Sequence, residues 1–112
     1  MLAKKYRFHS RGGVKYTYQK GKTIRSPKLS LVYTANTKGF QRFGVVVSKK
    51  IEKSAVGRNR IRRRIYEVIR AELPNYQAKN DCLFVVYSKD LLKMPFSELQ
   101  SLVHSLLEQS MI

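Results

Sequence analysis

The spacing of hydrophobic residues changes along the chain, and these changes mark the elements that the sequence predicts. Residues 29–34 (LSLVYT), 43–48 (FGVVVS) and 82–87 (CLFVVY) form short apolar runs that are rich in β-branched and aromatic side chains. Such runs are typical of strands. The run at 43–48 is nearly continuous, which favours a central strand that is covered on both faces.

Three other segments have the spacing of helices. In residues 53–70 (KSAVGRNRIRRRIYEVIR), four apolar residues, Ile61, Ile65, Val68 and Ile69, fall within an arc of about 100°. This helix should end near Leu73, before a proline. Residues 95–108 keep the same period, and residues 10–20 predict a shorter helix that Gly21 stops. The order helix, strand, strand, helix, strand, helix predicts an α/β sandwich, a small sheet with helices packed on it. The long helix could join two parallel strands.

The composition fits one folded domain over residues 1–112, with a basic segment at residues 1–9 that we expect to be flexible. Hydrophobic residues make up 43% of the chain, enough to build a core. The one cysteine, Cys82, excludes an internal disulfide and a cysteine-rich metal site. We find neither an apolar run of membrane-spanning length nor a secretory signal, and we therefore expect a cytoplasmic protein.

The charge of the chain is large and unevenly distributed. There are 23 Lys and Arg against 7 Asp and Glu, a formal net charge of +16, and no acid precedes Glu52. A compact domain with this excess repels itself unless a polyanion screens it. Nucleic acid is the expected polyanion. A membrane surface is disfavoured, because the apolar side of the 53–70 helix is needed for the core.

The 53–70 helix combines its apolar stripe with a cationic surface. From Lys49 to Arg64 there are eight basic residues and one acid, whereas an ordinary solvated face interleaves both signs. Arginine suits planar, bidentate contacts to phosphate, and the helix N-terminus near residues 54–58 adds a partial positive charge. The RNA-binding candidates are Lys49, Lys50, Lys53, Arg58, Asn59, Arg60, Arg62, Arg63, Arg64 and Arg70. For Asn59, a local hydrogen bond near the helix start and a contact to RNA or to a hydrated metal ion are equally favoured.

Aromatic residues among basic ones provide a second signal. Tyr16, Tyr18 and Tyr33 stand among lysines and arginines, a pattern that suits single-stranded nucleic acid, whose bases stack on rings. The alternative for Tyr33 is packing in or beside the core, because alternation would place it on one face with Leu29 and Leu31. We favour base stacking for Tyr18 and Tyr33, and less so for Tyr16.

The sequence predicts no catalytic residue and no metal site in the protein. Its acids are scattered without the spacing of a metal-binding pair, and His9 and His104 lie far apart in the sequence. We find no nucleophile motif and no phosphate-binding glycine loop. Chemistry carried by the protein alone is therefore not expected.

At residues 48–70, SKKIEKSAVGRNRIRRRIYEVIR, the sequence resembles the protein subunit of bacterial ribonuclease P. The resemblance rests on SKK, the following RNR at 58–60, and a basic helix that ends in arginine. Looser similarity covers most of the chain: the LVYT and FGVVVS strands, an Asp-x-hydrophobic strand at 81–87, and a last helix entered through FSEL.

This resemblance implies features that the residues alone do not show. The fold would have a four-stranded sheet and a left-handed βαβ crossover, against the right-handed default. The protein would be a subunit of an endoribonuclease whose catalytic RNA, with its Mg²⁺ ions, cuts precursor tRNA and releases the 5′ leader. The basic helix would contact the catalytic RNA, and a cleft between the sheet and the first helix would hold the leader.

The resemblance carries over to individual positions. Those matching the family's RNA contacts and cleft aromatics are Lys49, Lys50, Arg58, Asn59, Arg60, Arg62, Arg63, Tyr18 and Tyr33. Three positions depart from the family pattern. Val14 stands where an aromatic residue is frequent, unless Tyr16 takes that role. Glu52 stands where many members have glycine, and Gly57 loosens the helix start before Arg58.

Two other functions are compatible with a basic α/β protein. A structural protein of the ribosomal type would hold folded RNA without a role in cleavage, and the ordered RNR motif with a cleft of aromatics favours the ribonuclease P subunit over it. A DNA-binding regulator would place the arginine helix in a major groove, but such proteins usually have a helix-turn-helix and a dimer surface. The sequence indicates neither feature.

Overall fold

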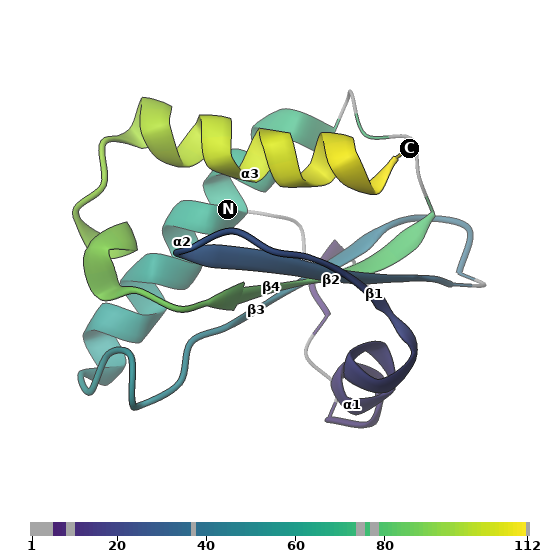
Figure 1. Cartoon of the computed structure of the whole chain (residues 1–112), viewed down its shortest axis with the longest axis horizontal. Helices are drawn as coiled ribbons and strands as arrows, with labels where there is room; N and C mark the ends of the chain where they lie inside the picture. Colours follow the sequence, from purple (N-terminus) through teal and green to yellow (C-terminus); the bar gives the residue numbers. More distant parts are fainter. Residues whose placement is uncertain (1–5, 9–10, 37, 74–75, 77–78, 112) are drawn as a thin grey trace.

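The computed structural model describes residues 6–8, 11–36, 38–73, 76 and 79–111. Its elements are, in order, α1 (Arg11–Lys20), β1 (Lys22–Ile24), β2 (Leu29–Ala35), β3 (Arg42–Val46), α2 (Ala55–Glu72), β4 (Asn80–Val86), the 3-10 helix η3 (Lys89–Leu92) and α3 (Phe96–Ser110) (Figure 1). The predicted α/β class is confirmed. None of the described helices is long and apolar enough to cross a membrane.

The four strands form one mixed sheet in the order β1-β2-β4-β3. β2 runs antiparallel to β1 and to β4, with Leu31 opposite Phe84. β3 runs parallel to β4, with Val45 opposite the same Phe84. α2 therefore connects two parallel strands, as its place in the sequence indicated. The left hand that the resemblance implies for this crossover stays a prediction.

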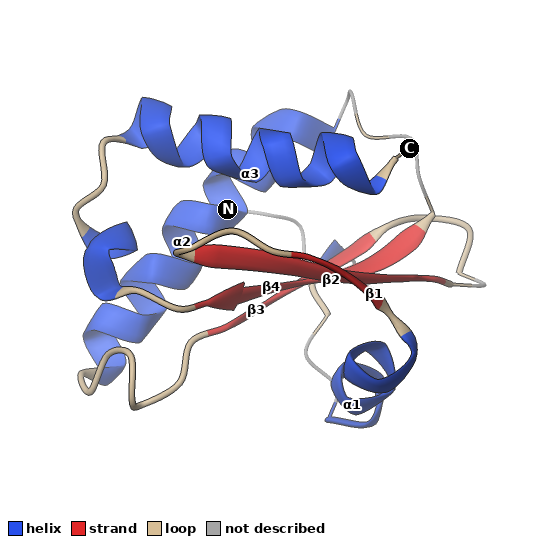
Figure 2. Cartoon of the chain, viewed as in Figure 1, coloured by secondary structure: helices blue, strands red, loops and turns tan. Residues whose placement is uncertain are grey.

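Helices lie on both sides of the sheet: α2 and α3 cover one face and α1 lies against the other (Figures 1 and 2). The main core fills the space between the sheet and the α2–α3 layer. Its fully buried side chains include Leu29, Leu31, Phe43, Ile61, Ile65, Phe84 and Leu99. Each apolar side chain of this size stabilises the fold by about 1.5–3 kcal/mol when it leaves water. The predicted alternation in β2 is confirmed, because Leu29 and Leu31 face this core together.

α2 forms because its sequence supplies both a cap and an apolar stripe. Ser54 is the N-cap, and its side-chain oxygen accepts a hydrogen bond from the backbone N–H of Gly57 at 3.2 Å. Ile61, Ile65 and Ile69 recur at helical spacing and are fully buried. Because this stripe packs on the sheet and on α3, the intervening arginines are left on the outer side and the flanks of the helix.

Gly21 ends α1 as the sequence predicted. Its N–H donates to the carbonyl oxygen of Thr17 at 2.8 Å. A Cβ at this position would lie 2.5 Å from the same oxygen and 2.8 Å from the carbonyl oxygen of Tyr33. Only glycine therefore allows the chain to turn from α1 into β1 so close to β2.

The prediction that β3 is a central strand is wrong. β3 lies at an edge of the four-stranded sheet, and its apolar run reflects cover by α2 on one face and by residues 7–8 alongside. Arg7 bridges to Phe43, and the N–H of Phe8 donates to the carbonyl oxygen of Phe43 at 2.6 Å. The N-terminal segment that we expected to be flexible is thus held against β3 at these residues.

Other differences concern the ends of elements. β1 and η3 were not predicted, since strands and helices of 3 and 4 residues are too short to show a period. α3 continues to Ser110, two residues beyond the predicted end. Three parts of the prediction lie outside the described residues: the rest of the N-terminal segment, the predicted start of the first helix at Ser10, and the proline at position 74 that was expected to stop the long helix.

Candidate nucleic-acid interface

The outer side of α2 and the loop before it carry exposed cations. Arg60 and Arg63 are exposed on the helix, where helical geometry predicted Arg63 opposite the apolar stripe and Arg60 on its flank. Lys49, Lys50 and Lys53 are exposed in the loop that leads into the helix. These five residues are named the α2 cationic surface below. Side chains of this kind can contact RNA phosphates without any change in the fold.

Two other predicted RNA-binding arginines have partners within the protein. Arg58 lies across the loop before α2, and its Nη1 donates to the carbonyl oxygens of Glu52 at 3.0 Å and Lys53 at 2.9 Å. Arg70 forms an ion pair with Glu67, one helical turn away, at 3.1 Å. Both guanidinium groups keep further N–H donors. Their contacts to RNA stay predictions.

Arg64 joins α2 to the connection before α3. Its two terminal nitrogens donate to the carbonyl oxygens of Leu91 and Met94. Leu91 belongs to η3 and is fully buried, so these bonds fasten η3 against the helix. The geometry gives Arg64 a structural task, in contrast to its exposed neighbour Arg63.

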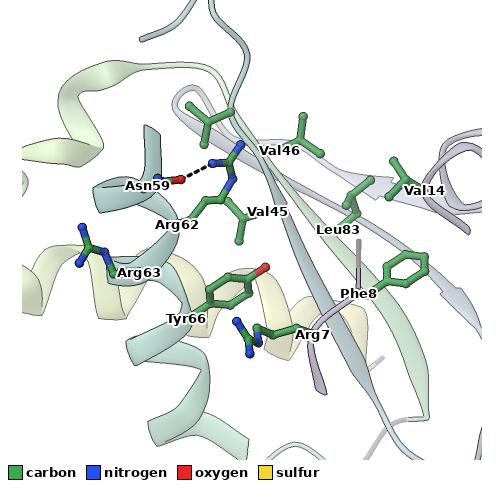
Figure 3. A pocket seen from close by; sticks show the side chains of 11 residues that line it. Arg7, Phe8, Val14, Val45, Val46, Asn59, Arg62, Arg63, Tyr66 and Leu83 are labelled. Atoms are coloured by element: carbon green, nitrogen blue, oxygen red, sulfur yellow. Dashed lines mark hydrogen bonds between the residues drawn. The ribbon is translucent and has the colours of Figure 1, made fainter. Parts of the chain in front are cut away.

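Asn59 forms the local hydrogen bond that was one of its two interpretations. Its Oδ1 accepts from Nη1 of Arg62 at 2.9 Å (Figure 3). The bond links successive turns of α2 and fixes the Arg62 guanidinium beside the groove described next. A contact of Asn59 to RNA or to a hydrated metal ion stays a prediction.

A groove of about 810 Å³ opens between α2, β3 and α1 (Figure 3). It is lined by Arg7, Phe8, Val14, Val45, Val46, Val47, Asn59, Arg62, Arg63, Tyr66 and Leu83. We call it the α2–β3 groove. Its apolar walls suit the faces of nucleic-acid bases, and its guanidinium groups suit phosphate. Such a lining is typical of sites for a single strand rather than for a duplex.

A set of polar contacts holds Phe8 in the groove wall. The Arg42 guanidinium lies 4.6 Å from the centre of the Phe8 ring, a cation–π contact. The same guanidinium donates to both carboxylate oxygens of Asp81, at 2.8 and 2.7 Å, and this hydrogen bonding raises the pKa of Arg42. Gly44 packs against Phe8, since a Cβ there would lie 2.3 Å from the Phe8 carbonyl oxygen.

The three predicted stacking tyrosines do not line this groove. Tyr16 and Tyr18 are 55% and 46% exposed on α1. Tyr33 packs against the core on the opposite face of the sheet, the face that it shares with Leu31. Partial burial, together with the nearby Tyr87, raises the pKa of Tyr18. The structure therefore separates Tyr33 from the two tyrosines of α1, and their base-stacking roles stay predictions.

Groups that could carry metal or nucleophilic chemistry are engaged in the fold. Within the described part of the chain, no cluster of three His, Cys, Asp or Glu side chains is placed to hold a metal ion. Burial raises the pKa of Cys82 to about 12, so its thiol stays protonated. His104 of α3 contacts Glu72 of α2 at 2.7 Å and Glu108 at 2.9 Å.

Comparison with known proteins decides the family. The family model described as ribonuclease P matches residues 2–111. The chain belongs to the ribonuclease P protein family. A ribonuclease P protein component from Chloroflexus aurantiacus is 37% identical over 92 residues, which cover 82% of this chain and 67% of the relative. Another from Synechococcus sp. is 32% identical over 114 residues, which cover 98% of this chain and 85% of the relative.

Solved ribonuclease P proteins share the fold. The Staphylococcus aureus protein has a TM-score of 0.80 at 23% identity, covering 94% of each chain. The Thermotoga maritima protein has a TM-score of 0.81 at 20% identity, covering 92% of this chain and 96% of its own. Family membership makes this chain a subunit of a ribonuclease, with the ribonuclease P RNA as its partner.

Sequence reasoning missed several groove-lining residues of the ribonuclease P fold. These are Arg7, Phe8, Val46, Tyr66 and Leu83. An arginine next to a phenylalanine in the basic first segment was an available signal, but that segment was expected to be flexible. Val14, which departs from the family pattern, does line the groove. It provides a smaller apolar surface than an aromatic side chain would.

Proposed function

We propose that the α2 cationic surface binds the catalytic RNA of ribonuclease P and that the α2–β3 groove receives the single-stranded 5′ leader of precursor tRNA. The protein thereby assists endonucleolytic removal of the leader. The chemistry resides in the RNA, which holds most of the required Mg²⁺. Lysines and arginines reduce that Mg²⁺ requirement, because they replace cations around the phosphate backbone.

The observation that carries this proposal is the composition of the groove. Its lining has four valines, a phenylalanine and a leucine beside three arginines, and no acid among the residues that the structure describes. Arg63 belongs both to the groove and to the exposed cationic surface, so the two sites adjoin. A strand bound in the groove can therefore continue directly toward RNA bound along α2.

The alternative is a structural RNA-binding protein of the ribosomal type, without a role in cleavage. The α2 cationic surface alone would support both functions equally. The groove favours the ribonuclease P role, because a protein that holds folded RNA needs no mixed apolar and cationic channel for a single strand. A cytoplasmic location, and the absence of DNA and membrane partners, stay predictions.

A charge placed in the groove tests the leader site. Val46 is half-buried in the wall, so Val46→Glu and Val46→Gln add side chains of equal size that differ in charge. We expect the holoenzyme with Val46→Glu to bind precursor tRNA about fivefold more weakly than Val46→Gln, because the carboxylate repels phosphate. Binding of mature tRNA should be the same for both variants.

Equal losses for precursor and mature tRNA would place the leader elsewhere. Urea unfolding of both variants is the control. If both variants lose stability equally, the difference in their affinity for precursor tRNA is still due to the charge.

A further inference from the structure

Glu52 is the single acid among the first 66 residues. It lies in the loop that carries Lys49, Lys50 and Lys53, directly before α2. An acid close to a helix N-terminus stabilises the helix dipole, and this is the ordinary role of such a residue. Its place inside a surface that is otherwise cationic suggests a second role.

The Glu52 carboxylate is fixed at the start of α2. Its Oε1 accepts a hydrogen bond from the backbone N–H of Ser54, the N-cap residue, at 3.1 Å. Arg58 reaches back to the Glu52 carbonyl oxygen at 3.0 Å, so the backbone of the loop is held as well. An anion is therefore already bound at the positive end of the helix, where phosphate would otherwise be favoured.

Gly57 provides the space that this arrangement needs. A Cβ at position 57 would lie 2.8 Å from both Cγ and Cδ of Glu52, and 3.2 Å from its Oε2. Any side chain there would push the flexible glutamate away from the helix. Glycine is unfavourable inside a helix, so its presence in the first turn calls for a reason. The two departures at positions 52 and 57 thus form one feature.

We propose that Glu52 lowers the affinity of this protein for RNA, because its carboxylate, held over Gly57, repels phosphate at the start of α2. This inference rests on the proposed function, since it requires that the α2 cationic surface meets RNA. Attraction to the phosphate backbone is independent of sequence, so a chain of net charge +16 binds unrelated RNA as well. A fixed carboxylate within the contact surface reduces that attraction.

This role is tested by measuring the affinity of four proteins and a control for the catalytic RNA of ribonuclease P from the same genome, by titration at several salt concentrations. The four are the wild type, Glu52→Gln, Gly57→Ala and the double variant. The control, Glu108→Gln, makes the same charge change on α3. We expect Glu52→Gln to bind about two- to fivefold more tightly, with a steeper salt dependence.

Gly57→Ala should produce a similar gain, because the added Cβ displaces the carboxylate. The double variant should bind no more tightly than Glu52→Gln, since no charge is left to displace. Glu108→Gln should match the wild type.

Unchanged affinity for the catalytic RNA in both Glu52→Gln and Gly57→Ala would overturn the inference. A lower urea midpoint for Glu52→Gln would then show that Glu52 only stabilises the start of the helix. Gains that add in the double variant would also overturn it, since Gly57→Ala would then act without Glu52. The proposed function is tested separately. If the wild type binds the catalytic RNA more tightly than an unrelated structured RNA of equal length, the proposed function stands whatever the variants show. A wild type without that preference contradicts the proposed function itself.

Discussion

Neighbouring arginines on α2 have different surroundings, and we therefore expect them to have different tasks. Arg63 is exposed and lines the α2–β3 groove, whereas Arg64 donates to the carbonyl oxygens of Leu91 and Met94. The sequence could not distinguish them, because both lie on the cationic part of a helix and differ only by one step of rotation. The difference between them comes from η3, which packs beside Arg64 and was too short to predict from the sequence.

Alanine substitutions at these two arginines should have different effects on RNA binding and on stability. Arg63→Ala should weaken binding to the catalytic RNA and reduce its salt slope by about one unit, with stability within about 0.5 kcal/mol of the wild type. Arg64→Ala should instead lower the free energy of unfolding by about 1–3 kcal/mol, because two carbonyl groups lose a charged donor. RNA titration and urea unfolding of both variants separate the two effects. A loss of RNA affinity in Arg64→Ala without loss of stability would contradict this assignment.

At the scale of elements, long periodic segments could be predicted and contacts between distant segments could not. The stripe of α2, the alternation of β2 and the apolar run of β4 were all visible in the sequence, because each follows from burial of one side of a regular element. The edge position of β3 was not visible, since residues 7–8 cover it from far away in the sequence. The resemblance implied a cleft between the sheet and the first helix, but most residues that line the groove could not be named, because β3, β4, α1 and α2 meet there only in the folded chain.

The contact between α2 and α3 predicts a pH dependence of stability. The hydrogen bond to Glu72 raises the pKa of His104 above its ordinary value of 6.5, and Glu108 on the same helix adds to this effect. A raised folded-state pKa means that the stabilisation is fully present below the unfolded pKa and is lost as the pH rises through the folded pKa. The wild type should therefore have a higher free energy of unfolding than His104→Gln, and the difference between them should be larger at about pH 5.5 than at about pH 8.5.

Urea unfolding at the two pH values measures this difference. A difference that stays constant, or grows with pH, would show that the protonated histidine does not stabilise the packing of α3 on α2.

At the scale of the whole molecule, the charge is distributed unevenly over the elements. No lysine or arginine follows Lys93, so α3 carries none, whereas Glu52 is the sole acid before Glu67. The loop before α2, the outer side of α2 and the α2–β3 groove are therefore the parts best suited to RNA, and the outer side of α3 is the least suited. Composition already indicated a protein that binds nucleic acid. The position of the groove beside the cationic helix is the reason why we propose a single-stranded leader as its ligand.

The most direct test of the central claim is cleavage of precursor tRNA at low Mg²⁺ concentration. Precursor tRNA is mixed with the catalytic RNA of ribonuclease P from the same genome, with and without this protein, and release of the 5′ leader is followed. We predict efficient release only when the RNA and the protein are both present. Release by the protein alone would contradict chemistry residing in the RNA. Tight binding of the protein to the RNA without any gain in cleavage would contradict its role in processing and would favour a structural RNA-binding protein.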